Sequence, residues 1–362
     1  MKCSICGNDD ERLFLNNKCL KCLKYIKKDS VVDENYIPSK IKGNYTLTKR
    51  QEEISKQIIN LIDNEDVLIN AVTGAGKTEM IYPLIERMVN EDKKIGFASP
   101  RKDLIIELDE RIRSTFPTCS INTLYGGHNS VSNASLYIFT THQVGFFVDF
   151  FDCLILDEVD AFPYYKNEVL NSLVKRSVKG HIVYMSATIS KMKNVKTLTL
   201  NRRYHNKDIP TPKICIRCFK KIFLYRIVKK LLKKDRYILI FVSSIKVGEE
   251  LHKYLQRYIK SISFIHSKVI NRESLFNDIK KYKYKIIITT TILERGITLK
   301  NVSAIVYDSE SAIFDESTLL QIVGRVGRKV GYEEGEIIFL STCRKKKMNN
   351  VIKRINELNK SM

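Results

Sequence analysis

The sequence lacks any long hydrophobic run. No stretch of its 362 residues approaches the ~18–20 apolar residues that a membrane-spanning helix needs. The first ten residues, MKCSICGNDD, also lack the apolar core of a signal peptide. We therefore expect a cytoplasmic protein, and attachment to a membrane surface through a partner stays open.

Acidic residues are scarce relative to basic ones. The chain has 40 Asp and Glu against 62 Lys and Arg, a formal net charge of +22. Such a surplus favours a polyanionic partner, because cation–phosphate contacts release condensed counterions. Single clusters such as CRKKKMNN (343–350) are typical of a solvated surface, so the inference rests on the total. The length and the 44% hydrophobic content predict two to three packed domains.

Because no secretory signal is apparent, the nine cysteines do not indicate a disulfide framework. Four of them form two Cys-x2-Cys pairs that can place four thiolates around one Zn²⁺ and stabilise a short segment with little core. The predicted zinc ligands are Cys3, Cys6, Cys19 and Cys22. Redox chemistry is the alternative. Cys215 and Cys218 lie in a strand-like stretch that directs them to opposite faces, so a second zinc site is not favoured.

The stretch NAVTGAGKTEMIY, residues 70–82, is typical of a phosphate-binding loop. It follows an apolar strand predicted over 66–70 and precedes a helix predicted over 79–90. Glycines let backbone N–H groups converge on phosphate oxygens, while Lys77 reaches the terminal phosphates and Thr78 holds Mg²⁺. The generic pattern begins with Gly, and this chain has Ala71 there. The predicted ATP-binding residues of the loop are Thr73, Gly74, Ala75, Gly76, Lys77 and Thr78.

A second motif, FDCLILDEVD at residues 151–160, places two carboxylates after an apolar strand. Asp157 at the end of such a strand can hold Mg²⁺ together with Thr78, and Glu158 can orient the attacking water. An isolated acidic pair is usually surface charge. Its position downstream of a phosphate loop favours nucleotide hydrolysis instead.

With these two motifs, the order of further motifs resembles superfamily 2 helicases and translocases. The remaining motifs are LTKRQEEIS (47–55), ASPRKDL (98–104), FTTHQV (139–144), MSAT (185–188), ILIFVSS (238–244), TTTILERGIT (289–298) and QIVGRVGR (321–328). Single motifs of this kind are weak, but their order along the chain is specific.

The resemblance implies a role for individual residues. Gln51 corresponds to the glutamine that recognises adenine. The residues that couple ATP to movement are Ser186, Thr188 and Gly296. The DNA-binding candidates are Pro100, Arg101, Thr141, His142, Ser243 and Thr290. The catalytic set is Lys77, Asp157, Glu158, Arg325 and Arg328, in which the two arginines stabilise charge on the γ-phosphate and their spacing predicts one helical face.

The four-cysteine module, DEVDAFPY (157–164) and the last two motifs together resemble the ComFA family of late-competence ATPases. This resemblance implies ATP, Mg²⁺ and Zn²⁺ as cofactors, and hydrolysis stimulated by single-stranded DNA during DNA uptake in natural transformation. It also implies a ComFC-type competence partner, the inner-membrane DNA channel, and a place at the inner face of the cell membrane, with a homo-oligomer left open. Gln321 replaces the His of many RNA helicases, and no strand-separating domain is visible.

The expected fold is α/β, with two tandem RecA-like parallel-sheet domains preceded by a small zinc module. We expect the module and linker at residues 1–42, the first domain at 43–205 and the second at 206–362. One alternative is a general superfamily 2 helicase in replication restart or RNA remodelling, although PriA-like helicases carry their cysteines within the second core. The other is a non-catalytic DNA-binding adaptor with an inactive ATP fold, disfavoured because the catalytic residue types are all present.

Overall fold

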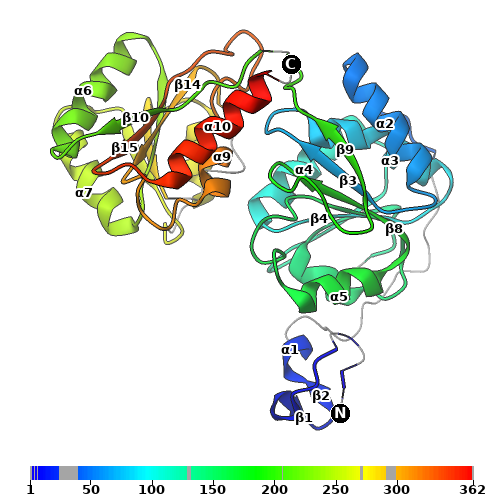
Figure 1. Cartoon of the computed structure of the whole chain (residues 1–362). Helices are drawn as coiled ribbons and strands as arrows, with labels where there is room; N and C mark the ends of the chain where they lie inside the picture. The colour runs from blue at the N-terminus through cyan, green and yellow to red at the C-terminus, as the bar shows by residue number, and fades with distance from the viewer. Residues whose placement is uncertain are drawn as a thin grey trace. The chain divides into compact units, whose positions relative to one another are not determined.

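Two α/β units make up the chain in the computed structural model (Figure 1). The structure describes residues 2–3, 5, 7–23, 40–128, 132–205, 207–269, 272–290 and 299–360. By their internal contacts, the first unit is Met1–Ala71 with Gly76–Leu200, and the second is Asn201–Met362 with Val72–Ala75. Among the described residues, no helix combines the length and apolar character that crossing a bilayer requires.

The first unit is built on a seven-stranded sheet in which every pair of neighbouring strands is parallel. In sheet order the strands are β5 (Ile121–Leu124), β6 (Leu136–Thr140), β4 (Ile95–Ser99), β7 (Phe151–Leu156), β8 (Val178–Ser186), β3 (Val67–Ala71) and β9 (Lys196–Leu200). All residues of β3, β4 and β6 are buried. Strands of a parallel sheet that is covered on both faces are continuously apolar, and this is the pattern that predicts strands in the sequence.

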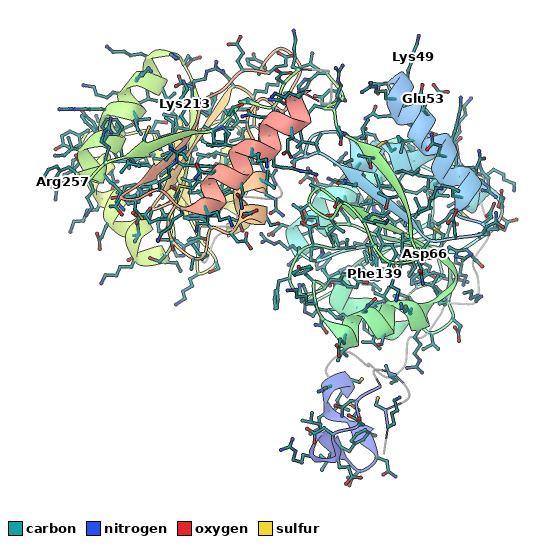
Figure 2. All side chains as sticks on the ribbon, in the orientation of Figure 1. Lys49, Glu53, Asp66, Phe139, Lys213 and Arg257 are labelled. Atoms are coloured by element: carbon teal, nitrogen blue, oxygen red, sulfur yellow. The ribbon has the colours of Figure 1, made fainter. Side chains whose placement is uncertain are left out.

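Helices cover this sheet on both faces (Figure 1). They are α2 (Lys49–Leu61), α3 (Lys77–Asn90), α4 (Lys102–Thr115), α5 (Glu168–Ser177) and the 3₁₀ segment η2 (Thr141–Phe146). The element α2 begins at a capping box in which Thr48 and Gln51 satisfy each other's backbone N–H groups. Beneath α5 lies an aromatic core in which Phe139, labelled in Figure 2, stacks on Phe151 with ring centroids 5.5 Å apart.

The described residues of the N-terminal segment, up to Leu23, form short elements. They are η1 (Glu11–Leu13), β1 (Phe14–Leu15), β2 (Lys18–Cys19) and α1 (Leu20–Leu23), with β1 and β2 paired antiparallel. Among these described residues, the buried cluster is Cys3, Cys19 and Cys22, with Ile5, Phe14 and Val169 of α5 packed against it. So small a core gives little hydrophobic stabilisation, consistent with a segment that needs another source of stability.

The second unit repeats the parallel architecture with a six-stranded sheet. Its strands in sheet order are β10 (Lys213–Ile216), β15 (Ile337–Ser341), β14 (Val302–Tyr307), β11 (Tyr237–Phe241), β13 (Ile286–Thr289) and β12 (Ile262–Ile265). Its helices are α6 (Lys220–Lys233), α7 (Ile245–Gln256), α8 (Arg272–Lys280), α9 (Glu316–Val323) and α10 (Lys346–Lys360). The two sheets confirm the predicted α/β class with two tandem parallel-sheet domains.

The predicted elements near the site are displaced by one or two residues at their ends. The strand expected over 66–70 runs from Val67 to Ala71, and the helix expected over 79–90 begins at Lys77. The expectation that Cys215 and Cys218 lie on one strand was wrong. Because β10 ends at Ile216, Cys218 lies beyond the strand and is exposed, so the alternation inferred from Cys215 does not extend to it.

Candidate active site

The phosphate loop and the acidic motif leave the same edge of the first sheet. Strand β3 pairs with β8 (Asn70 opposite Ser186), and β8 pairs with β7 (Tyr184 opposite Leu156). The C-terminal ends of β3 and β7 are therefore two strand spacings apart, about 10 Å. Ligands of parallel α/β sheets bind at this edge, so the topology brings the two sequence motifs to one place.

The loop has the backbone that phosphate binding requires. Gly74 (φ +86°) and Gly76 (φ +78°) both adopt the left-handed region, where residues with a side chain are strained. Lys77 opens α3, and its Nζ donates to the carbonyl of Ala71 at 3.1 Å, back across the loop. The first N–H groups of a helix and the positive end of its dipole favour an anion at this point.

Gln51 lies directly against the loop. Its side chain is buried, and a Cβ added to Gly76 would come within 2.2 Å of Gln51 Nε2. Its Oε1 accepts from the backbone N–H of Thr48 at 2.9 Å, so the helix cap fixes the side chain and leaves the amide nitrogen toward the loop. The sequence suggested this residue only through the family resemblance. The structure adds the contact with Gly76.

The two carboxylates follow β7 in strained, hydrogen-bonded backbone. The N–H of Asp157 donates to the Ala98 carbonyl at 2.8 Å, and its Oδ1 accepts from the N–H of Glu158 at 2.9 Å. Glu158 adopts a φ of +53°, which is uncommon for a residue with a side chain and recurs at functional sites. Both side chains are half-buried.

The last residue of the acidic motif, Asp160, connects it to the MSAT motif. Its carboxylate accepts from Ser186 Oγ at 2.9 Å and from Thr188 Oγ1 at 2.8 Å. Ser186 Oγ in turn accepts the N–H groups of Thr188 and Ile189 at 3.1 and 3.0 Å. Asp160 is not among the site residues predicted from the sequence, although it is the fourth residue of DEVD. The third predicted coupling residue, Gly296, lies outside the described residues.

The predicted nucleic-acid contacts of the first unit also gather at this sheet edge. Pro100 and Arg101 follow β4, while Thr141 and His142 follow β6, and the two strands are neighbours with Ser99 opposite Thr140. His142 is exposed and Arg101 half-buried. Thr141 is 1% exposed, so its side chain is poorly placed for direct contact with a ligand.

In the second unit, Ser243 and Thr290 are neighbours in the same way. They follow β11 and β13, which pair with Phe241 opposite Thr289, and the N–H of Val242 donates to the Thr289 carbonyl at 2.8 Å. Both side chains are half-buried at the C-terminal edge of the sheet. The remainder of the Thr290 motif, residues 291–298, lies outside the described residues.

The prediction that Arg325 and Arg328 share one helical face was wrong. Helix α9 ends at Val323 with Gly324 as its C-cap, so both arginines lie in the turn that follows. Gly327 has a φ of +65°, and a Cβ there would come within 2.1 Å of the Glu333 carbonyl oxygen. Gly324 keeps a right-handed helical φ of −62° as the C-cap, and Gly327 supplies the left-handed residue of the turn. Arg325 is 7% exposed and Arg328 half-buried.

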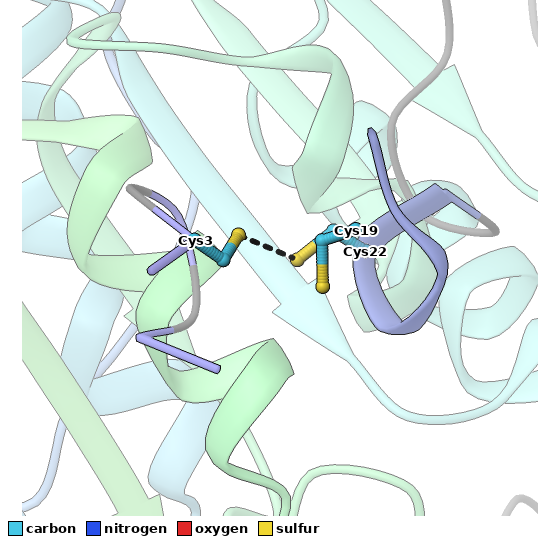
Figure 3. A group of neighbouring side chains, drawn as sticks. All are labelled: Cys3, Cys19 and Cys22. Carbon is cyan, nitrogen blue, oxygen red and sulfur yellow. Dashed lines mark hydrogen bonds between the residues drawn. The ribbon is translucent and has the colours of Figure 1, made fainter. Parts of the chain in front are cut away.

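The N-terminal cysteines form a separate candidate metal centre. The sulfur atoms of Cys3, Cys19 and Cys22 lie within 4.8 Å of one another and are buried (Figure 3). The Cys3 and Cys22 sulfurs are 3.8 Å apart. Zn–S bonds of about 2.3 Å in a tetrahedron give a sulfur–sulfur separation of about 3.8 Å, so this donor set fits Zn²⁺. Cys6, the fourth predicted ligand, lies outside the described residues.

Comparison with known proteins agrees with this architecture. Residues 44–191 match the family model "Type III restriction enzyme, res subunit", and residues 220–330 match "Helicase conserved C-terminal domain". The chain is 32% identical to competence protein ComFA of Bacillus subtilis, over 99% of this chain and 85% of that protein. It is 34% identical to competence protein ComFA of Streptococcus pneumoniae, over 94% and 85% respectively.

Solved structures show the same fold. Dbp5 of S. cerevisiae bound to RNA and ADP BeF3 superposes with a TM-score of 0.68 at 20% identity, covering 87% of this chain and 88% of that one. The Mycobacterium smegmatis helicase Lhr bound to single-stranded DNA and AMP-PNP gives a TM-score of 0.63 at 16% identity, covering 85% and 48%. Both units are thus RecA-like helicase domains in their fold.

Proposed function

The chain belongs to the ComFA family of competence proteins, and from this premise we propose that it is an ATPase stimulated by single-stranded DNA that drives DNA uptake during natural transformation. Its two helicase core domains make it a superfamily 2 helicase-like ATPase. The observation that carries the proposal is the shared sheet edge at which the phosphate loop, the acidic pair and the Asp160 network meet.

Each group at this edge has a task in phosphoryl transfer. Lys77 and the N-terminus of α3 stabilise the negative charge of the terminal phosphates. Thr78 and Asp157 would hold Mg²⁺, which neutralises charge on the phosphate oxygens when bound. Glu158 orients the attacking water and accepts its proton, and its half-buried position limits competing solvent. Hydrolysis in this scheme needs little more than positioning and electrostatics.

Arg325 and Arg328 complete the proposed chemistry by acting on the same nucleotide as Lys77. Guanidinium groups form forked hydrogen bonds to phosphate oxygens and stabilise the charge that develops in the transition state. Loss of the γ-phosphate removes this attraction, so the arginines respond to the state of the nucleotide. The Asp160 network is the proposed route by which that change reaches the nucleic-acid contacts.

Single-stranded DNA is the proposed polymer. Arg101 and His142 in the first unit, with Ser243 and Thr290 in the second, are the proposed backbone contacts, and the net charge of +22 supports a polyanionic ligand. The cysteine cluster is proposed to hold a structural Zn²⁺. Association with a ComFC-type partner and the DNA channel at the inner face of the membrane is proposed from family membership alone.

The proposal is tested by ATP turnover with single-stranded DNA, duplex DNA and RNA of equal length. Lys77→Ala should still bind single-stranded DNA but show no DNA-stimulated turnover. Lys49→Ala, an exposed lysine of α2 (Figure 2), is the matched control and should behave like the unaltered protein. Turnover unaffected by Lys77→Ala would end the proposal. Stimulation by RNA alone would favour a general helicase, and no turnover by the unaltered chain would favour an inactive adaptor.

A further inference from the structure

The segment between the two sheets turns back onto the arginine-bearing turn of the second unit. Residues 201–212, between β9 and β10, form no helix or strand where they are described. Arg203 Nη1 donates to the carbonyl oxygens of Val326 and Gly327, both at 2.7 Å. Its Nη2 lies 3.5 Å from the Gly324 carbonyl oxygen.

The two residues that follow bind the same turn. Tyr204 Oη donates to the Arg328 carbonyl at 3.1 Å. His205 Nε2 lies 3.0 Å from the Gly327 carbonyl oxygen and must carry the proton, since a carbonyl only accepts. His205 Nδ1 accepts the N–H of Lys207 at 3.2 Å, which fixes this tautomer. Three consecutive side chains therefore hold the backbone of the turn; we call Arg203, Tyr204 and His205 the carbonyl clamp.

Arg203 is an unusual group to bury for stability alone. It is 1% exposed, and among the described residues no carboxylate forms an ion pair with it. Burial, with repulsion from Arg328, lowers its pKa to about 10. A buried charge is costly unless its hydrogen bonds are satisfied, and here backbone carbonyls satisfy them. We therefore explain the burial of Arg203 by its effect on the backbone whose carbonyl groups it binds.

Helix α9 does not continue through the turn, where the N–H groups of Arg325 and Val326 form i to i−3 bonds to the carbonyls of Ile322 and Val323, at 3.0 and 3.2 Å. Arg325 and Arg328 lie beyond the end of α9, so the regular i to i−4 hydrogen bonds do not fix their backbone. The carbonyls of residues 326, 327 and 328 instead accept from the carbonyl clamp. Since a misplacement of about 1 Å at a catalytic group costs about 100-fold in rate, holding this backbone has a direct catalytic consequence.

We propose that the carbonyl clamp, chiefly Arg203, positions Arg325 and Arg328 for transition-state stabilisation. This inference rests on the proposed ATPase function. Arg203 itself is a positioning residue that acts through the backbone of the turn. Lys in its place keeps the charge but lacks the planar fork that binds two carbonyls at once.

The test measures ATP turnover and nucleotide affinity of Arg203→Met, Arg203→Lys and Tyr204→Phe, with Arg257→Met as the matched control. Arg257 is exposed on the second unit, and its side chain forms no hydrogen bond or ion pair with the described residues (Figure 2). We expect Arg203→Met to lower kcat at saturating single-stranded DNA by about 10- to 100-fold, with KM for ATP changed less than about threefold. Arg203→Lys should recover only part of kcat. ADP should bind as before, while the extra affinity for ADP–aluminium fluoride, a transition-state mimic, should be lost.

A purely structural role predicts a different pattern, in which melting temperature, ADP affinity and kcat fall together; that pattern, or an unchanged kcat, overturns the inference. If Arg203→Met does not fold, Tyr204→Phe removes a single hydroxyl and decides the matter. We expect it to lower kcat about threefold or more with unchanged melting, and unchanged kcat overturns the inference. Absence of turnover in the unaltered chain would instead refute the proposed function, so the two failures are distinguishable.

Discussion

Substitution of Gly76 by Ala tests how Gln51 and the phosphate loop depend on each other. Gly76 has a φ of +78°, and a left-handed backbone costs a residue with a Cβ about 1–2 kcal/mol. The new Cβ would also lie 2.2 Å from Gln51 Nε2 and 3.2 Å from Glu79 Oε2. The backbone cannot yield here without distorting the loop, so the amide end of Gln51 must move.

The expected magnitudes follow from these two effects. The strain of about 1–2 kcal/mol lowers the melting temperature of a unit of this size by about 2–8 °C. Loss of one hydrogen bond from Gln51 to the nucleotide costs about 0.5–1.5 kcal/mol, which weakens ATP binding about 2- to 12-fold. Gln51→Ala alone should produce the same weakening. In the Gly76→Ala background it should add less than about twofold, because the amide is already displaced.

The assay is equilibrium binding of ATP to the two single variants and the double variant, together with thermal unfolding. Gly127→Ala is the matched control, since Gly127 also has a left-handed φ of +90° but no atom lies within 4 Å of the added Cβ. It should lower the melting temperature and leave ATP binding unchanged. If Gln51→Ala lowers ATP affinity by the same factor in the unaltered protein and in the Gly76→Ala variant, the position of Gln51 does not depend on Gly76. That result would refute the prediction.

Three further predictions concern other parts of the molecule. Asp160→Ala removes the carboxylate that accepts from the hydroxyls of Ser186 and Thr188. In steady-state kinetics, DNA-stimulated turnover should fall about 2- to 30-fold while KM for ATP stays nearly constant. An equal loss of turnover without DNA would argue against a coupling role. Metal analysis should find one zinc per chain and less in Cys22→Ser, and a metal-free chain with an intact N-terminal segment would exclude the zinc site. Burial lowers the pKa of His205 in the folded chain, so on acidification the unfolded chain takes up this proton first. The melting temperature should therefore fall as the pH drops below 6.5, and it should fall less in His205→Gln. An equal fall in both proteins would contradict this.

Much of the candidate site could be predicted because each motif directly follows one strand that is buried on both faces. Lys77 and Thr78 follow one continuous apolar strand, and Asp157 and Glu158 follow another. In a parallel sheet such strands must end at the same edge, so sequence order alone predicts a common site. Gln51 could be predicted only from the family resemblance. It lies in the polar first turn of α2, where the sequence gives no sign that its side chain is buried.

The parts that could not be predicted depend on tertiary contacts or on glycine geometry. The spacing of Arg325 and Arg328 fits a helix. The helix instead ends at Val323 and the chain turns at Gly327 with a left-handed φ, which periodicity cannot reveal. Arg203 pairs with backbone carbonyls 121 to 124 residues away, and backbone acceptors leave no trace in side-chain identity. Its burial therefore became visible only in the structure.

The central proposal is that Arg325 and Arg328 act on the nucleotide that the phosphate loop binds. The most direct measurement is the steady-state ATPase rate of the unaltered chain and of Arg325→Ala, each without DNA and with saturating single-stranded oligonucleotide. We predict a rate that rises at least tenfold with DNA in the unaltered chain, and a rate in Arg325→Ala that stays low in both conditions while ATP still binds. A DNA-stimulated rate that survives in Arg325→Ala would contradict the claim.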